Sequence, residues 1–211
     1  MKKLYHFYKR SNSIAILLFL LGSQHIFSAS EREMLILGDS LSAGYGIPAE
    51  KQWVKLVQEK LDAEDKKLKL INASVSGETT KGGLLRLPTL LETYSLDFLF
   101  IELGANDGLR GYPAARVKSN LLEMCNLAKN EGIDIFIMEI IVAPNYGTKY
   151  MNHLERVYEE VSNECKARLV PPLLNENIVL NKDLMLPDGI HPNAQGQVII
   201  ADDLYSWISK L

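Results

Sequence analysis

The chain has few of the side chains that metal ions, nucleotides and nucleic acids usually need from a protein. Its 211 residues include two cysteines and four histidines, with no Cys-x-x-Cys pair and no histidine at metal-ligand spacing. Gly44-x-Gly46 lacks the third glycine of a dinucleotide fingerprint, and no Gly-Lys-Ser/Thr sequence occurs. Four of the 23 basic residues and none of the 26 acidic ones lie in the first thirty positions, so the other 181 residues carry a net charge of −7. We therefore expect no metal, no cofactor and no nucleic acid partner.

Long apolar runs are also scarce. The run near the N-terminus covers residues 14–21, with basic residues at positions 2, 3, 9 and 10 before it and Ser28-Ala29-Ser30 after it. This order is typical of a secretory signal peptide. A membrane anchor is the less favoured alternative, because a span needs about twenty apolar residues. We expect a signal peptide over residues 1–30 and an exported domain, periplasmic or secreted from a bacterium, over residues 31–211.

The two cysteines, Cys125 and Cys165, each lie on a stripe of apolar residues at helical spacing. The favoured interpretation is a pair of buried free thiols that act as small hydrophobic side chains. A disulfide between neighbouring helices is the alternative, which depends on a Cα separation that a sequence does not supply.

Short apolar runs alternate with segments of helical periodicity along the rest of the chain. The predicted strands are residues 34–37, 68–71, 98–101 with Leu103, 133–141 and, less regularly, 170–174. The predicted helices are residues 53–61, 84–94 interrupted by Pro88, 113–130, 150–169, and 194–210 capped by Asn193 with Val198, Ala201, Tyr205 and Ile208 facing inward. This alternation indicates one three-layer α/β/α domain with a parallel sheet. In such sheets the functional crevice lies at the carboxyl ends of the strands.

Three loops that follow predicted strands carry small polar residues or glycines. Ser40 follows the first strand, where its hydroxyl can serve as a nucleophile and its N–H can point out of a helix N-terminus; a capping role is the alternative. Gly77 follows the second strand and Asn106 the third. Both could donate hydrogen bonds to a developing oxyanion, and both could equally be turn residues.

Only His153 and His191 remain as possible bases outside the leader. His153 lies on an amphipathic helix, where a partly exposed structural position is favoured. His191 follows Asp188 by three residues, so the carboxylate can reach the imidazole Nδ1–H and stabilise the imidazolium formed during proton transfer. The alternative for this pair is a local turn hydrogen bond.

Serine, glycine, asparagine and Asp-x-x-His in four successive loops resemble the SGNH or GDSL hydrolase family. The resemblance extends from Met34 to about Trp207. Its motifs are residues 38–42, 76–78, 104–108 and 188–192, with further matching stretches at 41–46, 85–88, 106–111 and 144–147. Within the family the chain is similar to bacterial periplasmic enzymes that act on acyl-CoA thioesters, lysophospholipids and aryl esters. Ala105 stands where many relatives have glycine, and Ile141 where those enzymes often have a basic residue.

The resemblance implies a mostly parallel, flavodoxin-like sheet of five strands and a monomeric serine hydrolase of acyl esters and thioesters, with a small-molecule acyl ester or lysophospholipid as substrate. It assigns Ser40 as nucleophile, His191 as general base and Asp188 as its orienting partner. The implied oxyanion hole consists of Ser40, Gly77 and Asn106. Leu109, Arg110, Pro144, Asn145 and Tyr146 would flank an acyl groove. A carbohydrate O-deacetylase on the same scaffold and a catalytically silent lipid-binding protein are the alternatives.

Overall fold

The computed structural model describes residues 30–141 and 146–211 of the chain. The predicted signal peptide, apart from Ser30, lies outside these residues, as do Pro144 and Asn145 of the predicted acyl-binding loop. None of the helices in the described part of the chain combines the length and apolar character that a bilayer span requires.

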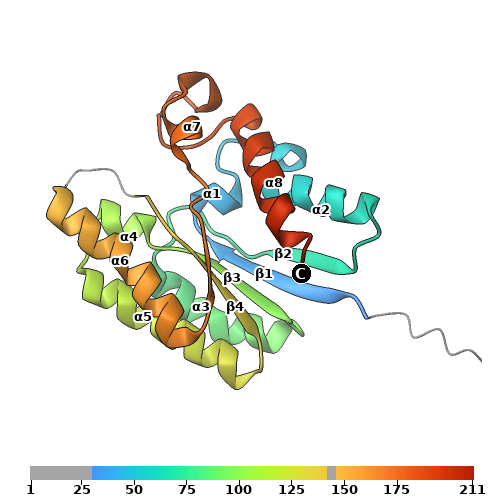
Figure 1. Cartoon of the computed structure of the whole chain (residues 1–211), viewed down its shortest axis with the longest axis horizontal. Coiled ribbons are helices and arrows are strands. Elements are labelled where there is room, and N and C mark those ends of the chain that lie inside the picture. The colour runs from blue at the N-terminus through green and yellow to red at the C-terminus, as the bar shows by residue number, and fades with distance from the viewer. Residues whose placement is uncertain (1–29, 142–145) are drawn as a thin grey trace, which may run out of the picture.

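A sheet of five parallel strands, in the order β2-β1-β3-β4-β5, forms the middle layer (Figure 1). The strands are β1 Arg32–Gly38, β2 Leu68–Asn72, β3 Phe98–Glu102, β4 Asp134–Met138 and β5 Arg168–Val170. This order confirms the predicted flavodoxin-like α/β fold. The prediction of a last strand over residues 170–174 is wrong: β5 ends at Val170, because Pro171 and Pro172 lack the N–H that a sheet ladder needs. The neighbouring β4 ends at Met138, three residues before the predicted boundary.

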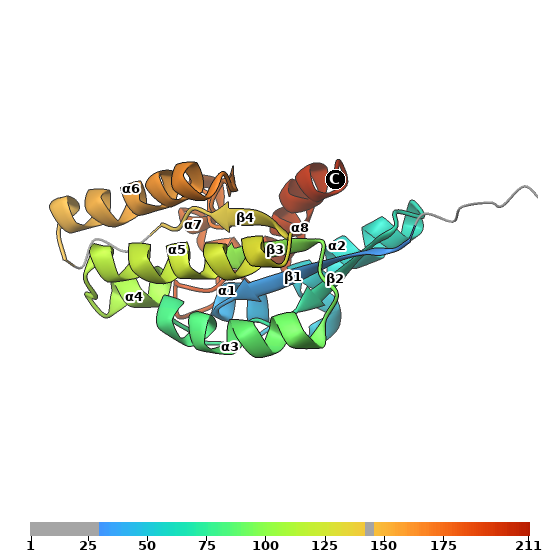
Figure 2. The same cartoon turned by 90° about the horizontal axis from the view of Figure 1, so that it is seen from below.

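Helices cover both faces of the sheet (Figures 1 and 2). One face holds α3 Thr80–Thr93, α5 Ala114–Asn130 and α6 Thr148–Cys165; the other holds α2 Trp53–Ala63 and α8 Ala194–Ile208. Successive residues of β1 divide between these layers: Leu35 and Leu37 pack under α3 and α5, and Met34 and Ile36 pack under α2 and α8. The short helices are α1 Ser40–Ala43, α4 Ala105–Leu109 and α7 Glu176–Val179, with 3₁₀ turns η1 Ala49–Lys51 and η2 Lys182–Leu184.

The predicted helix ends need correction at two places. The α3 helix begins at Thr80, before the predicted start at Leu84, because the Thr79 hydroxyl caps it by accepting a hydrogen bond from the Gly82 N–H at 3.2 Å. The helix continues through Pro88. The α6 helix ends at Cys165, because Lys166 adopts the left-handed conformation at φ 51°.

The predicted inward face of α8 is wrong at one position. Val198 is 47% exposed, and the buried stripe instead passes through Gln197, Ile200 and Leu204. Gln197 is 1% exposed because its side-chain oxygen accepts a hydrogen bond from the Trp53 N–H at 2.8 Å. A polar residue therefore occupies a core position, and this shifted the apparent phase of the apolar pattern.

Cys125 of α5 and Cys165 of α6 form a disulfide, with their Cα atoms 6.1 Å apart. The favoured prediction of two free thiols is wrong, and the alternative is right. Both cysteines do lie on buried helix faces, as their spacing predicted. The two faces meet, which places the sulfur atoms in bonding range.

Candidate active site

Four segments from the carboxyl edge of the sheet bring the predicted site residues together. Ser40 is the first residue of α1, directly after β1, and Asn106 lies in α4, directly after β3. Gly77 lies in the loop between β2 and α3, and Asp188 and His191 lie between η2 and α8. The short helices α1 and α4 are too brief to show a periodic pattern; the expected helix N-terminus at Ser40 is confirmed by α1, and α4 was not predicted.

Ser40, His191 and Asp188 form a continuous chain of hydrogen bonds. Ser40 Oγ lies 2.8 Å from His191 Nε2, and His191 Nδ1 lies 2.8 Å from Asp188 Oδ2. The other carboxylate oxygen of Asp188 accepts hydrogen bonds from the backbone N–H groups of Ile190 and His191, at 2.9 and 3.0 Å. Burial opposes the ionisation of Asp188, but these N–H groups and the imidazole outweigh it and lower its pKa to about 2. Asp188 is therefore a carboxylate whenever His191 takes up a proton.

The ring of Tyr45 packs against the imidazole of His191, with 4.6 Å between the ring centroids. The His191 imidazole, which contacts the Ser40 hydroxyl, is therefore held by the Asp188 carboxylate at Nδ1 and by the Tyr45 ring packed against it. Tyr45 is 53% exposed and lies at the mouth of the site. In the sequence, Tyr45 falls within the matching stretch of residues 41–46 but was not predicted to belong to the site.

Asp39 is buried beneath the site and fixes the side chain of Asn106. Its Oδ2 accepts a hydrogen bond from Asn106 Nδ2 at 3.0 Å, and its Oδ1 accepts one from the Leu41 N–H at 3.0 Å. One amide hydrogen of Asn106 is engaged in this way, and the other has no acceptor among the residues that the structure describes. Burial raises the pKa of Asp39 to about 6, against the two hydrogen bonds, which lower it.

A second buried carboxyl group, Glu102, lies next to Asp39 at the end of β3. It is 1% exposed and accepts hydrogen bonds from the Ser42 hydroxyl at 2.7 Å and the Asp39 N–H at 3.3 Å. Burial and the neighbouring Asp39 raise the pKa of Glu102 well above its usual range. The sequence analysis missed this residue.

Two backbone N–H groups remain available at the site. Among the described residues, neither the N–H of Ser40 nor that of Gly77 donates a hydrogen bond to another group. Gly77 has a φ of +79°, and a Cβ there would meet no atom within 4 Å, so the backbone conformation and not the available space calls for glycine. Together with the Asn106 amide, these groups offer three neutral donors around Ser40.

Comparisons with known proteins identify the family of the chain. The model of the GDSL-like Lipase/Acylhydrolase family matches residues 36–199. The chain belongs to this family. It is an ester hydrolase of the serine type, which confirms the enzyme prediction over the silent lipid-binding alternative.

Three similar proteins illustrate the relationship to this acylhydrolase. An arylesterase of Vibrio mimicus is 41% identical over 175 residues, which cover 83% of this chain and 87% of the relative. A thioesterase 1/protease 1/lysophospholipase L1 of Escherichia coli strain K12 is 36% identical and covers 87% of this chain and 84% of its own. The crystal structure of the psychrotrophic esterase EstA from Pseudoalteromonas sp. superposes with a TM-score of 0.83 at 42% identity, over 85% of this chain and 97% of that one.

A buried polar network holds α4 of the acylhydrolase against its neighbours. Asp107, next to Asn106, accepts hydrogen bonds from the Thr80 N–H and the Thr80 hydroxyl, both at 2.8 Å. The Thr80 hydroxyl in turn accepts a hydrogen bond from the Asn120 amide at 2.8 Å. The helix that carries Asn106 is thereby tied to the start of α3 and to α5.

The predicted acyl-groove residues of the acylhydrolase are only partly accounted for. Leu109 and Tyr146 lie together at the surface, where the Tyr146 hydroxyl donates to the Leu109 carbonyl at 3.3 Å. The Arg110 guanidinium donates to the Gly77 carbonyl at 3.1 Å.

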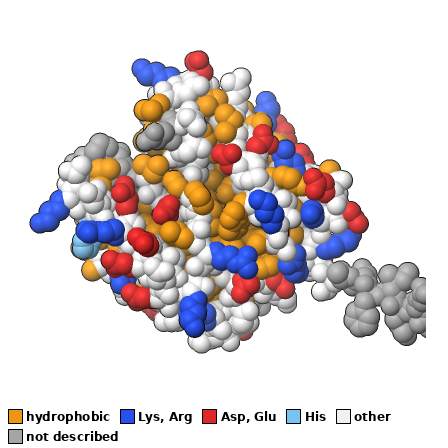
Figure 3. All heavy atoms as spheres, viewed as in Figure 1, with side chains coloured by type: hydrophobic (Ala, Val, Ile, Leu, Met, Phe, Trp, Pro, Cys, Tyr) orange, Lys and Arg blue, Asp and Glu red, His pale blue; other side chains and the backbone are white. Residues whose placement is uncertain are grey.

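A small apolar pocket that sequence reasoning missed lies beside the site. Its lining includes residues next to Ser40 and Asn106 in the sequence, namely Leu41 and Ala105, together with Ile140, Ile141, Leu173 and Leu174. Apolar side chains continue from there over the face between α6 and α8 (Figure 3), where Pro172 and Leu173 also line a second hollow with Trp207.

Proposed function

We propose that Ser40 is the nucleophile that forms an acyl-enzyme with ester and thioester substrates. The observation that carries this proposal is the contact of 2.8 Å between Ser40 Oγ and His191 Nε2, with Asp188 behind it. The imidazole accepts the hydroxyl proton as Oγ attacks the acyl carbonyl, and it then delivers this proton to the departing alcohol or thiol. In the second half-reaction His191 activates water, which attacks the acyl-enzyme and frees the acid. The ionised Asp188 stabilises the imidazolium in both steps.

The tetrahedral oxyanion is held by the N–H groups of Ser40 and Gly77 and by the free amide hydrogen of Asn106. The Asp39 carboxylate supports this role, because its contact with Asn106 Nδ2 turns the nitrogen, and not the oxygen, toward the reacting carbonyl. A single donor of this kind is worth about 2.7–4 kcal/mol of the activation barrier. Asn106→Ala is therefore slow, with measurable residual activity.

The substrate class is acyl esters with an apolar acyl chain, such as lysophospholipids and aryl esters. Leu41 and Ala105, next to Ser40 and Asn106 in the sequence, line a small hollow with Ile140 and Ile141 and support this class, since they offer an acyl chain apolar surface. Residues 1–30 direct export, and the disulfide supports that location, because such bonds persist in oxidising compartments. Acyl-CoA is then cleaved in vitro, and the natural substrates are acyl esters in the compartment to which the protein is exported.

The test combines three alanine variants with a fluorophosphonate probe and a panel of p-nitrophenyl esters from acetyl to long acyl chains. Ser40→Ala and His191→Ala should lose nearly all turnover, and Ser40→Ala should no longer react with the probe. His153→Ala is the matched control, because His153 is exposed on α6, and it should keep wild-type activity. Wild-type turnover by Ser40→Ala would refute the nucleophile assignment. A strict preference for acetyl esters would refute the acyl-chain assignment and favour a carbohydrate deacetylase.

A further inference from the structure

At its tip, the loop that carries Gly77 is held by two hydrogen bonds, from the Arg110 guanidinium to the Gly77 carbonyl and from the Glu78 N–H to the Val75 carbonyl, both at 3.1 Å. Two further hydrogen bonds, from the Ala73 N–H to the Ile36 carbonyl at 2.9 Å and from the Val75 N–H to the Gly38 carbonyl at 3.0 Å, tie its first half to β1. Gly77 itself is exposed, and nothing would touch a side chain there. The direction of its N–H therefore depends on how the second half of the loop is held.

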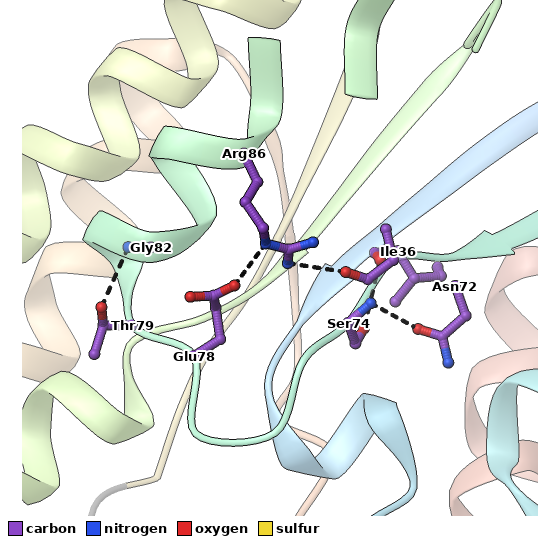
Figure 4. A network of polar contacts seen from close by, with 8 residues as sticks. Ile36, Asn72, Ser74, Glu78, Thr79, Gly82 and Arg86 are labelled. Atoms are coloured by element: carbon purple, nitrogen blue, oxygen red, sulfur yellow. Dashed lines mark hydrogen bonds and ion pairs between the residues drawn. The ribbon is translucent and has the colours of Figure 1, made fainter. Parts of the chain in front are cut away.

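Arg86, two turns into α3, spans both ends of this loop (Figure 4). Its Nε donates to Glu78 Oε2 at 2.7 Å, and its Nη2 donates to the Ala73 carbonyl at 2.9 Å. One rigid, planar guanidinium thus fixes the distance between residues 73 and 78. The side chain of Glu78 is 13% exposed and that of Arg86 is 34% exposed, so solvent screens this ion pair less than a fully exposed one.

Gly82 shows how closely Glu78 is seated on the first turn of α3. A Cβ on Gly82 would overlap Oε1 of Glu78. Glycine is a poor helix former, and its presence here leaves room for the carboxylate. The position near the N-terminus of α3 also favours a negative charge.

We propose that Arg86 and Glu78 are positioning residues of the oxyanion hole. Their ion pair closes the loop of residues 73–78, and the closed loop aims the Gly77 N–H at the reacting carbonyl. This inference rests on the proposed role of Gly77. It also gives a function to Arg86, whose surrounding stretch, residues 85–88, has no place in the catalytic triad.

The experiment compares Arg86→Met, Arg86→Lys and Gly82→Ala with the wild type, using a short p-nitrophenyl ester. Active sites are titrated with a fluorophosphonate, so that kcat refers only to correctly folded enzyme. Arg86→Met removes both hydrogen bonds, and Gly82→Ala displaces the Glu78 carboxylate while it keeps both charged residues. Arg156→Met is the matched control, because Arg156 is exposed on α6 and its Nε bonds within its own helix.

We expect kcat per titrated site to fall about tenfold or more in Arg86→Met and Gly82→Ala, with KM nearly unchanged, because a misplaced donor acts on the transition state. Arg86→Lys should lie between these variants and the wild type, and Arg156→Met should match the wild type. Near wild-type kcat in both Arg86→Met and Gly82→Ala would overturn the proposal. If Arg86→Met fails to fold, Gly82→Ala decides, since alanine is the better helix former. Ser40→Ala is measured alongside, and activity in that variant would refute the proposed function. If Ser40→Ala is inactive but Arg86→Met and Gly82→Ala keep wild-type kcat, only the positioning role of Arg86 and Glu78 is refuted.

Discussion

Replacing Asp39 by asparagine should make the enzyme more stable and slower at the same time. Burial raises the pKa of Asp39 from 3.8 to about 6, which means that the folded protein binds this proton more tightly than the unfolded chain does. The stability contributed by this group is therefore highest in acid, falls as the pH rises from about 4 to 6, and stays low at neutral pH. At about 1.4 kcal/mol for each pKa unit, the ionised carboxylate costs about 3 kcal/mol at pH 7. Asparagine avoids this cost, but its side-chain oxygen is a weaker acceptor for the Leu41 N–H and the Asn106 amide than a carboxylate is. We therefore expect the free energy of unfolding at pH 7 to rise by about 1–2 kcal/mol.

The loss of activity follows from the contact with Asn106. Without a charged acceptor at 3.0 Å, the Asn106 amide is free to turn its oxygen toward the reacting carbonyl. The upper limit of the loss is one oxyanion donor, so kcat should fall between about tenfold and a few hundredfold. Because Asp39 acts through Asn106, the double variant Asp39→Asn/Asn106→Ala should be no slower than Asn106→Ala alone.

Urea unfolding near pH 5 and pH 8, together with kcat across the same range, tests both effects. The charged groups that influence Asp39 are Glu102 at the end of β3, Asp107 in α4 and His191. Wild-type activity should decline as Asp39 takes up its proton near pH 6, and Asp39→Asn should lack this component of the pH profile. Asp134→Asn, at the exposed start of β4, is the control. Wild-type kcat in Asp39→Asn would refute this account. So would a double variant Asp39→Asn/Asn106→Ala whose loss of kcat equals the product of the two single losses.

Two further predictions concern Glu102 and the disulfide. Burial and the neighbouring Asp39 favour the neutral form of Glu102, so Glu102→Gln should keep stability and kcat near wild type. Glu102→Ala leaves the Asp39 N–H and the Ser42 hydroxyl unpaired and should lose about 1–3 kcal/mol of unfolding free energy for each group. Equal loss of stability in both variants by urea unfolding would show that the charge is needed. The Cys125–Cys165 bond closes a separation of 40 residues, so Cys125→Ser/Cys165→Ser should lose about 2–4 kcal/mol with kcat unchanged. An unchanged urea midpoint would show that the bond does not stabilise the fold.

The α/β/α architecture and the approach of the three strand-end residues could be predicted from local patterns, whereas the strand order and the contact of Ser40 with His191 were implied by the family resemblance. Apolar runs alternating with helical periods indicate parallel strands, and the carboxyl ends of parallel strands share one edge of the sheet. Ser40, Gly77 and Asn106 each follow a strand within a few residues, so their approach follows from the topology. Asp188 and His191 are three residues apart, which makes their contact a local one.

The parts that could not be predicted involve polar residues whose partners are distant in the sequence. Glu102 ends an apolar run and looks like an ordinary polar strand end, yet β3 lies between β1 and β4, and this central position buries its last side chain. Its partners Asp39 and Ser42 lie 63 and 60 residues earlier. Gln197 is buried by a partner 144 residues away. In each case burial depends on one specific tertiary contact, which periodicity does not encode.

Six of the eight buried polar residues in the described part of the chain belong to two networks next to the proposed oxyanion hole. The first consists of Asp39, Ser42 and Glu102, and the second of Thr80, Asp107 and Asn120. The first network fixes α1, which bears the Ser40 N–H, and orients the Asn106 side chain; the second fixes the helix that carries Asn106. Burial of polar groups costs stability, and here it is concentrated where donors must be aligned before the oxyanion forms. The third proposed donor, Gly77, lies on an exposed loop outside both networks, where Arg110 holds its carbonyl and the proposed Arg86–Glu78 clamp holds the ends of the loop.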